Sequence, residues 1–144
     1  MSFSSNVKSE LSHHFGNARH CNIAELSAIL NMCGHIANNG EKFCVKIQTE
    51  NPAAARKYFT LLKKTFNIDS EVLTRRNSQL KKNMVYMLFI NNKQQAEKML
   101  QACGILKFEN GRGRISNNID ELVVNSVCCK RAYIRGAFLA AGSI

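Results

Sequence analysis

The sequence predicts an α+β fold in which helices cover one face of an antiparallel sheet. Apolar residues recur at helical spacing in some segments and alternate with polar residues in others. Over residues 22–104 these patterns follow the order helix–strand–strand–helix–strand–strand–helix. The chain has 144 residues, of which 45% are hydrophobic and 21% are charged, so it suits a single globular domain with its own core.

The first helix is predicted to begin near residue 22. Asn22 is a candidate N-cap residue, and Glu25 stands three positions later, where a capping-box partner belongs. A short strand and an Asn-Gly turn follow, and Asn-Gly is a strong hairpin signal. Residues 43–48 then alternate apolar and polar side chains, so we expect a strand with one buried face.

The pattern then repeats. Asn51-Pro52 is typical of a helix start, because proline is tolerated at the first helical position. Strands are predicted around 68–76 and 83–90, and a third helix from about 93 to 103. Helices on one face of the sheet would leave its other face to solvent or a ligand.

The last third of the chain changes character. Residues 107–118 are rich in Gly, Asn and Arg, a composition typical of a linker. Helical patterns return at 120–127 and from Cys129 to about Gly142.

Two helices share a motif of small residues. Residues 26–34 and 134–142 both place a small residue at their third and ninth positions, with mostly apolar residues between. The two copies are about 108 residues apart, which indicates an internal repeat. Small residues let helix backbones approach closely, so we expect these helices to pack together at a pseudo-twofold seam.

The order of elements resembles the αββαββα repeat of LAGLIDADG homing endonucleases. Three segments resemble the WhiA family of Gram-positive bacterial regulators more closely: residues 128–144 (CCKRAYIRGAFLAAGSI), residues 49–52 and the basic run 75–83. The resemblance implies a LAGLIDADG-like α+β fold. It also implies a DNA-binding role in transcription regulation, for genes of sporulation, the cell cycle and cell division.

The resemblance suggests a division of the chain. We expect a polar lead-in at 1–21, a first LAGLIDADG-like repeat at 22–106, a linker at 107–118 and the start of a second repeat at 119–144. In the family a C-terminal helix-turn-helix domain follows, so the chain is expected to be an N-terminal fragment that lacks it.

Catalysis is not expected. Active LAGLIDADG enzymes carry an acidic residue just before the last glycine of each motif, where two carboxylates hold a divalent metal ion. This sequence has Cys33 and Ala141 at those positions, and neither supplies the oxygen ligands that Mg²⁺ requires. We therefore predict no enzyme activity, no catalytic residue and no cofactor.

The charge favours a polyanionic partner. The net charge is +10, and residues 73–144 contribute 12 basic against 4 acidic side chains. The resemblance implies that the sheet lies in the major groove of double-stranded DNA. The DNA-binding candidates are then Lys46, Gln48, Arg75, Arg76, Lys81 and Lys82 on or beside the sheet, with Arg112 and Arg114 adding phosphate contacts. Strand alternation allows only one of Arg75 and Arg76 to face the groove.

A second function stays open at this point. The same fold could act as a protein-interaction module that docks a sigma factor or the missing helix-turn-helix domain, with DNA bound elsewhere. Residues 84–90 are entirely apolar, which favours this alternative but also suits a central strand. A continuous basic patch on the sheet would favour DNA, and an exposed apolar patch would favour a protein partner.

No metal site and no membrane partner are predicted. The six cysteines form no C-x-x-C pair, and nothing in the spacing of His13, His14, His20 and His35 shows ligands converging. Cysteines are therefore expected in or near the core. The apolar runs are too short to span a bilayer and the N-terminus has no signal sequence, so a cytoplasmic, nucleoid-associated protein is expected.

Overall fold

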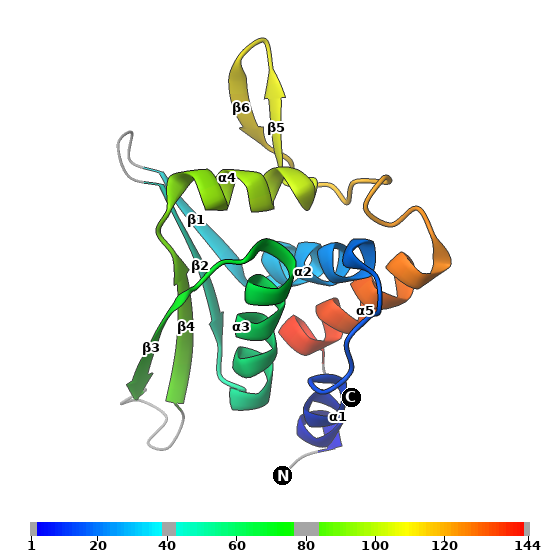
Figure 1. The fold of residues 1–144 in the computed structure, drawn as a ribbon. Helices are drawn as coiled ribbons and strands as arrows, with labels where there is room; N and C mark the ends of the chain where they lie inside the picture. Colours follow the sequence, from blue (N-terminus) through cyan, green and yellow to red (C-terminus); the bar gives the residue numbers. More distant parts are fainter. Residues whose placement is uncertain (1–2, 39–42, 77–83, 143–144) are drawn as a thin grey trace.

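A computed structural model describes residues 3–38, 43–76 and 84–142 of the chain (Figure 1). The predicted order of elements over the first repeat is confirmed. It comprises α2 (Arg19–Cys33), β1 (Gly34–Asn38), β2 (Phe43–Thr49), α3 (Pro52–Phe66), β3 (Glu71–Arg76), β4 (Met84–Ile90) and α4 (Lys93–Ala102). A further helix, α1 (Phe3–Leu11), precedes this unit, and α5 (Val127–Ala141) follows it.

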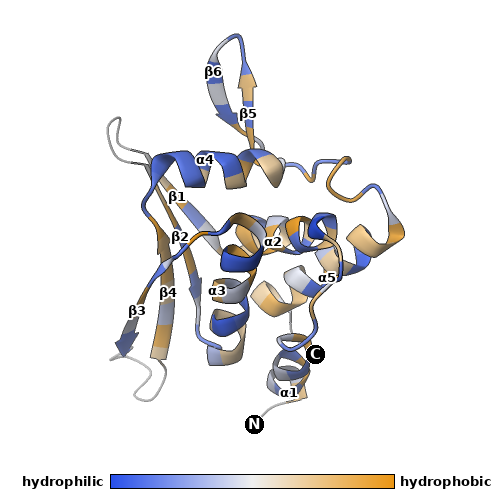
Figure 2. Cartoon of the chain, in the orientation of Figure 1, coloured by the Kyte–Doolittle hydropathy of each residue, from blue (hydrophilic) through white to orange (hydrophobic). Residues whose placement is uncertain are grey.

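The four strands form one antiparallel sheet in the order β1-β2-β4-β3. The helices α2, α3 and α4 lie on one side of this sheet, as Figure 1 shows. Alternate residues of the central strands, such as Val45, Ile47, Leu88 and Ile90, are buried in the core between the sheet and the helices. Figure 2 shows the complementary pattern on α4, whose outer surface is hydrophilic.

Local sequence explains where α3 begins and ends. The Asn51 side chain accepts hydrogen bonds from the backbone N–H groups of Ala53 and Ala54, at 2.9 and 3.1 Å, and Pro52 opens the helix as predicted. The helix ends at Phe66, and its C-cap residue Asn67 adopts the left-handed conformation with φ of 55°.

The seam expected from the internal repeat is present, because α5 packs along α2. Small side chains line the contact, including Ala24 and Ala28 on α2 and Ala132 on α5. At Gly136 the two backbones come so close that a Cβ atom would collide with the carbonyl oxygen of Glu25. Glycine is therefore required at position 136 by the approach of the helices.

A buried ion network joins the seam to the rest of the core. The Glu25 carboxylate is fully buried and lies 2.6 Å from the Lys57 ammonium of α3, and 3.0 Å from the Arg135 guanidinium of α5. Lys57 also donates hydrogen bonds to the carbonyl oxygens of Leu11 and His14. Burial lowers the pKa of Lys57 from its ordinary value, and the carboxylate of Glu25 opposes this shift.

The expected role of Glu25 is therefore wrong. The helix α2 begins at Arg19 and its N-cap residue is Ala18, so Glu25 stands well inside the helix instead of at its start. Its carboxylate binds two cations from other helices and caps no backbone group.

Residues 107–118 also differ from the expected linker. They contribute most of a hairpin, β5 (Leu106–Glu109) and β6 (Arg112–Ile115), which projects from the end of α4 (Figure 1). Asn110 and Gly111 make its turn with φ of 53° and 77°, the positive values that a tight hairpin turn requires. The Asn-Gly turn predicted at residues 39–40 lies outside the described residues.

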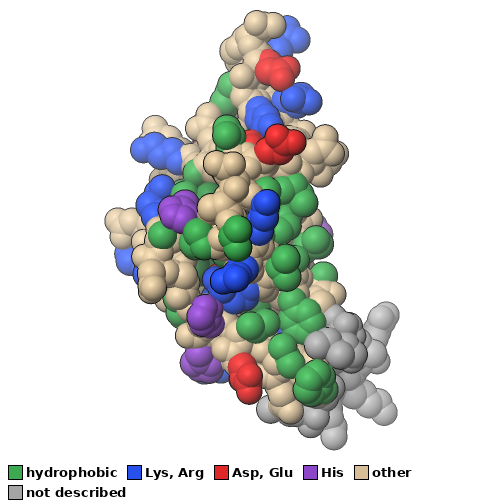
Figure 3. Space-filling view, turned by 90° about the vertical axis from the view of Figure 1, so that its right-hand side faces the viewer, with side chains coloured by type: hydrophobic (Ala, Val, Ile, Leu, Met, Phe, Trp, Pro, Cys, Tyr) green, Lys and Arg blue, Asp and Glu red, His purple; other side chains and the backbone are tan. Residues whose placement is uncertain are grey.

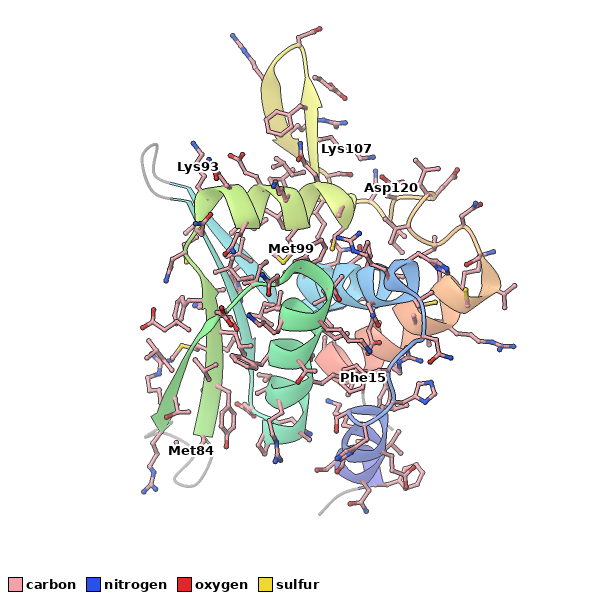
Figure 4. The ribbon with its side chains drawn as sticks, in the orientation of Figure 1. Phe15, Met84, Lys93, Met99, Lys107 and Asp120 are labelled. Carbon is pink, nitrogen blue, oxygen red and sulfur yellow. The ribbon has the colours of Figure 1, made fainter. Side chains whose placement is uncertain are left out.

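The segment after the hairpin is not the predicted helix over 120–127. It forms turns, and α5 begins only at Val127. Asp120 in this segment pairs with Lys107 of the hairpin at 3.4 Å (Figure 4). Among the described residues, no helix has the length and apolar character needed to cross a bilayer.

We expect Gly136→Ala to lower the free energy of unfolding by about 1–3 kcal/mol, as overpacking does. At an ordinary exposed helix position the same change stabilises by about 1 kcal/mol, so the sign of the effect reports the close approach. Urea denaturation followed by circular dichroism measures it. Arg131→Ala, at an exposed site on the same helix, is the control, and a stabilised Gly136→Ala protein would contradict the packing described.

We expect Glu25→Ala to lower the free energy of unfolding by about 3–5 kcal/mol, because it leaves Lys57 buried without its counter-charge. The double change Glu25→Leu with Lys57→Met should cost less than the sum of the single changes, because it removes both charges together. Additive costs in the same denaturation experiment would show that the two groups do not interact.

Candidate nucleic-acid interface

The side of the sheet turned away from the helices is the candidate site, and we call it the open face. No described helix or strand covers it (Figure 1). Strand pairing and alternation place on it residues from all four strands: His35, Ala37, Cys44, Lys46, Gln48, Glu71, Leu73, Arg75, Val85, Met87 and Phe89.

Cross-strand pairing arranges these side chains in rows. Lys46 lies between His35 of β1 and Phe89 of β4. In the next row Gln48 pairs with Met87, and Met87 pairs with Leu73 of β3. Lys46 and Gln48 are thus neighbours on the β1–β2 side.

Arg75 lies on the opposite side of the open face from Lys46, where it pairs with Val85. It is exposed, whereas Lys46 and Gln48 are half-buried. Between these polar groups the surface is apolar: Leu73 is 47% exposed, and Met87 and Phe89 are half-buried. The described part of the open face therefore has an apolar centre, with Lys46 and Gln48 on one side of it and Arg75 on the other. Glu71 contributes the one carboxylate among its described residues.

The side chains on the open face could make several kinds of contact in a DNA groove. An ammonium such as that of Lys46 suits a phosphate, whereas the Gln48 amide and the Arg75 guanidinium can each make paired hydrogen bonds to a base edge. Apolar side chains can contact the methyl group of thymine.

The structure places the described site residues in three groups: on the open face, on the helix side of the sheet and on the β5–β6 hairpin. Lys46, Gln48 and Arg75 share the open face, whereas Arg76 pairs with Met84 and points to the helix side of the sheet. This agrees with the expectation that only one of the two arginines faces the groove. Lys81 and Lys82 lie outside the described residues.

Arg112 and Arg114 belong to the third group, on the β5–β6 hairpin. Both are exposed, and Arg114 forms an ion pair with Glu109 across the hairpin at 3.0 Å. They lie on a paired two-stranded hairpin, which differs from the predicted linker.

The two positions at which active LAGLIDADG enzymes carry carboxylates are occupied by residues of other types. Cys33 and Ala141 are the last residues of α2 and α5. The Cys33 thiol donates to the Ile29 carbonyl oxygen at 3.3 Å, and burial raises the pKa of this thiol to about 11. A neutral thiol and a methyl group supply no ligand for Mg²⁺.

Sequence reasoning missed one cluster altogether. His20 and Cys21 at the start of α2 meet Cys128 and Cys129 at the start of α5, with their ligand atoms within 4.8 Å of one another. Burial, together with the neighbouring thiols of Cys128 and Cys129, raises the pKa of Cys21 to about 11. The Ser126 hydroxyl, which lies 3.0 Å from the Cys128 sulfur, lowers the pKa of Cys128.

Comparisons with known proteins agree with this fold. Residues 19–106 match the family model described as the WhiA N-terminal LAGLIDADG-like domain. Proteins named "Probable cell division protein WhiA" from Lachnoclostridium phytofermentans, Alkaliphilus metalliredigens and Clostridium perfringens are 46%, 43% and 39% identical over the whole chain. The chain spans 46% of the length of each of these relatives.

Two solved structures share the fold at 17% sequence identity, and each aligns over 96% of this chain. The N-terminal LAGLIDADG domain of DUF199/WhiA matches with a TM-score of 0.67, over 58% of that structure. Full-length DUF199/WhiA from Thermatoga maritima matches with a TM-score of 0.62, over 39% of that structure.

Proposed function

The chain belongs to the WhiA family, whose relatives bear the name of cell division proteins, and we propose that it binds double-stranded DNA without cutting it. In this proposal it is the DNA-binding domain of a transcription regulator that controls sporulation and cell-division genes. The observation that carries the proposal is the uncovered face of the sheet, on which Lys46, Gln48 and Arg75 lie on both sides of an apolar centre.

Charge supports a DNA partner. The chain carries a net charge of +10, and long-range attraction to phosphates would bring a duplex to its surface. Phosphate contacts from Lys46 would then position the chain, while Gln48 and Arg75 would contact base edges. Arg112 and Arg114 on the hairpin add positive charge next to α4, where further phosphates could be bound.

The absence of cleavage is part of the proposal. In the LAGLIDADG enzymes that this chain resembles, metal-dependent cleavage uses acidic oxygen ligands at the ends of both motif helices. Those ends carry Cys33 and Ala141, which would hold no metal ion against the backbone of a bound duplex.

Binding to a labelled duplex, followed by fluorescence anisotropy at several salt concentrations, tests the proposal. We expect log affinity to fall linearly with log salt, with a slope of about −0.9 for each phosphate contacted. Lys46→Glu with Arg75→Glu should weaken binding at least about tenfold and reduce the magnitude of the slope.

The matched control is Arg131→Glu with Lys130→Glu on α5, which changes the net charge by the same amount at exposed positions away from the open face. If both pairs weaken binding equally, the effect is one of total charge and the open face is not the DNA site. An absence of binding at low salt would contradict the proposal that this chain binds DNA.

The apolar centre of the open face favours a second candidate function, in which the face docks a protein. The partner would be a sigma factor or a helix-turn-helix domain, such as one in the part of full-length relatives that this chain does not span. Figure 3 shows a further apolar surface, a band of hydrophobic side chains on the side where α5 lies, and Val127 and Ile134 of α5 are among the exposed residues.

The remaining part of the Lachnoclostridium phytofermentans relative, added separately, distinguishes the two surfaces. If the open face docks that part, Leu73→Asp should abolish complex formation in analytical ultracentrifugation and Ile134→Asp should leave it intact. The reverse result assigns protein docking to α5 and leaves the open face for DNA.

A further inference from the structure

The cluster at the start of the seam has the composition of a metal site. One imidazole and three thiols converge there, His20 and Cys21 from the first turn of α2, and Cys128 and Cys129 from the first turn of α5. Three cysteines and one histidine are a ligand set characteristic of structural zinc.

The spacing of the donor atoms fits one tetrahedral ion. The His20 Nδ1 atom lies 3.0 Å from the sulfur of Cys129, 3.6 Å from that of Cys21 and 3.9 Å from that of Cys128. Zinc bonds of about 2.3 Å to sulfur and 2.0–2.1 Å to nitrogen separate a nitrogen and a sulfur ligand by about 3.5 Å. The three observed distances bracket this value, and all four donor atoms lie within 4.8 Å of one another.

The internal repeat gives an independent reason for the convergence. The seam motifs at 26–34 and 134–142 are offset by about 108 residues, and the same offset carries His20 onto Cys128 and Cys21 onto Cys129. The four ligands are therefore two equivalent pairs, which the pseudo-twofold relation of α2 and α5 brings together. A metal ion bound there would contact α2 and α5 through equivalent positions in the first turn of each helix.

Two of the four ligands are buried and two are exposed, an arrangement that suits a metal site. The inner pair, Cys21 and Cys129, is 6% and 4% exposed, whereas the outer pair, His20 and Cys128, faces solvent. An ion can thus enter from solvent past the outer pair and be held against the inner one. Both helices direct their N-termini to the cluster, and the positive end of a helix dipole stabilises thiolates.

We propose that His20, Cys21, Cys128 and Cys129 bind one zinc ion that fastens the start of α2 to the start of α5. Binding replaces the protons of three thiols by the metal ion and releases them to solvent, and neutral His20 donates the lone pair of Nδ1. No redox step is involved. The ion acts structurally and is independent of whether the open face binds DNA.

Metal analysis and cobalt substitution of the 144-residue chain test the site. Protein purified with a non-thiol reductant should contain equimolar zinc, and a chelator that removes it should lower the melting temperature by at least about 8 °C. Cobalt added to the stripped chain should give thiolate-to-metal charge-transfer absorption and the intense visible bands of a tetrahedral ion.

Cys128→Ser is the informative variant, because its exposed side chain can change without disturbing the core. It should weaken cobalt binding at least about 100-fold, since even changes outside the ligand shell cost 10–100-fold. His20→Ala should do the same. Cys44→Ser, on the open face, and His14→Ala are matched controls that should bind cobalt as the unchanged chain does.

Two results would overturn the proposal. One is a reduced, folded chain that shows no tetrahedral cobalt spectrum. The other is a disulfide between the two helices in the isolated chain, with no metal bound after its reduction. Because the cobalt spectrum is recorded first on the unchanged chain, the test does not depend on the variants folding.

Discussion

The buried carboxylate of Glu25 is the interaction on which the arrangement of the helices depends. It stands in the middle of α2 and binds the ammonium of Lys57 from α3 and the guanidinium of Arg135 from α5. Lys57 extends the network to the N-terminal segment through the carbonyl oxygens of Leu11 and His14, and its ammonium lies 5.0 Å from the centre of the Phe15 ring. A charge buried this deeply is tolerated only with its partners in place, so the network selects one arrangement of these segments.

The same residue sets how closely the two motif helices approach. The backbone carbonyl of Glu25 faces Gly136, and only glycine leaves room there. The side chain and the backbone of this one residue thus both contact α5, through Arg135 and at Gly136. With α2, α3 and α4 all packed on one side, the opposite side of the sheet is left as the open face, on which the proposed function depends.

Local patterns explain what the sequence could predict. Period-two alternation and the Asn51-Pro52 start depend on neighbouring residues alone, and the order of elements from α2 to α4 was predicted correctly from them. The split between Arg75 and Arg76 followed from alternation in the same way. The small residues of the two motifs also predicted the seam, because close helix packing needs glycine or alanine wherever the backbones cross.

Features that depend on distant contacts were missed. Glu25 fits a capping-box pattern, and only the position of α3 and α5 reveals that it binds Lys57 and Arg135. The convergence of Cys21 and Cys129 was likewise invisible to a search for short cysteine spacings, because their distance in sequence is 108 residues. The offset of the internal repeat was the available signal, since extending it to the first turns of both helices pairs these positions.

The central claim is that the open face, and not the helical side, meets DNA. The most direct measurement is the mapping of backbone amide chemical shifts while a duplex is titrated into the labelled chain. We expect the largest changes on β2, β3 and β4, at residues such as Lys46, Gln48 and Arg75, with α5 unperturbed. Changes confined to α5 and the exposed side chains around Ile134 would contradict the account.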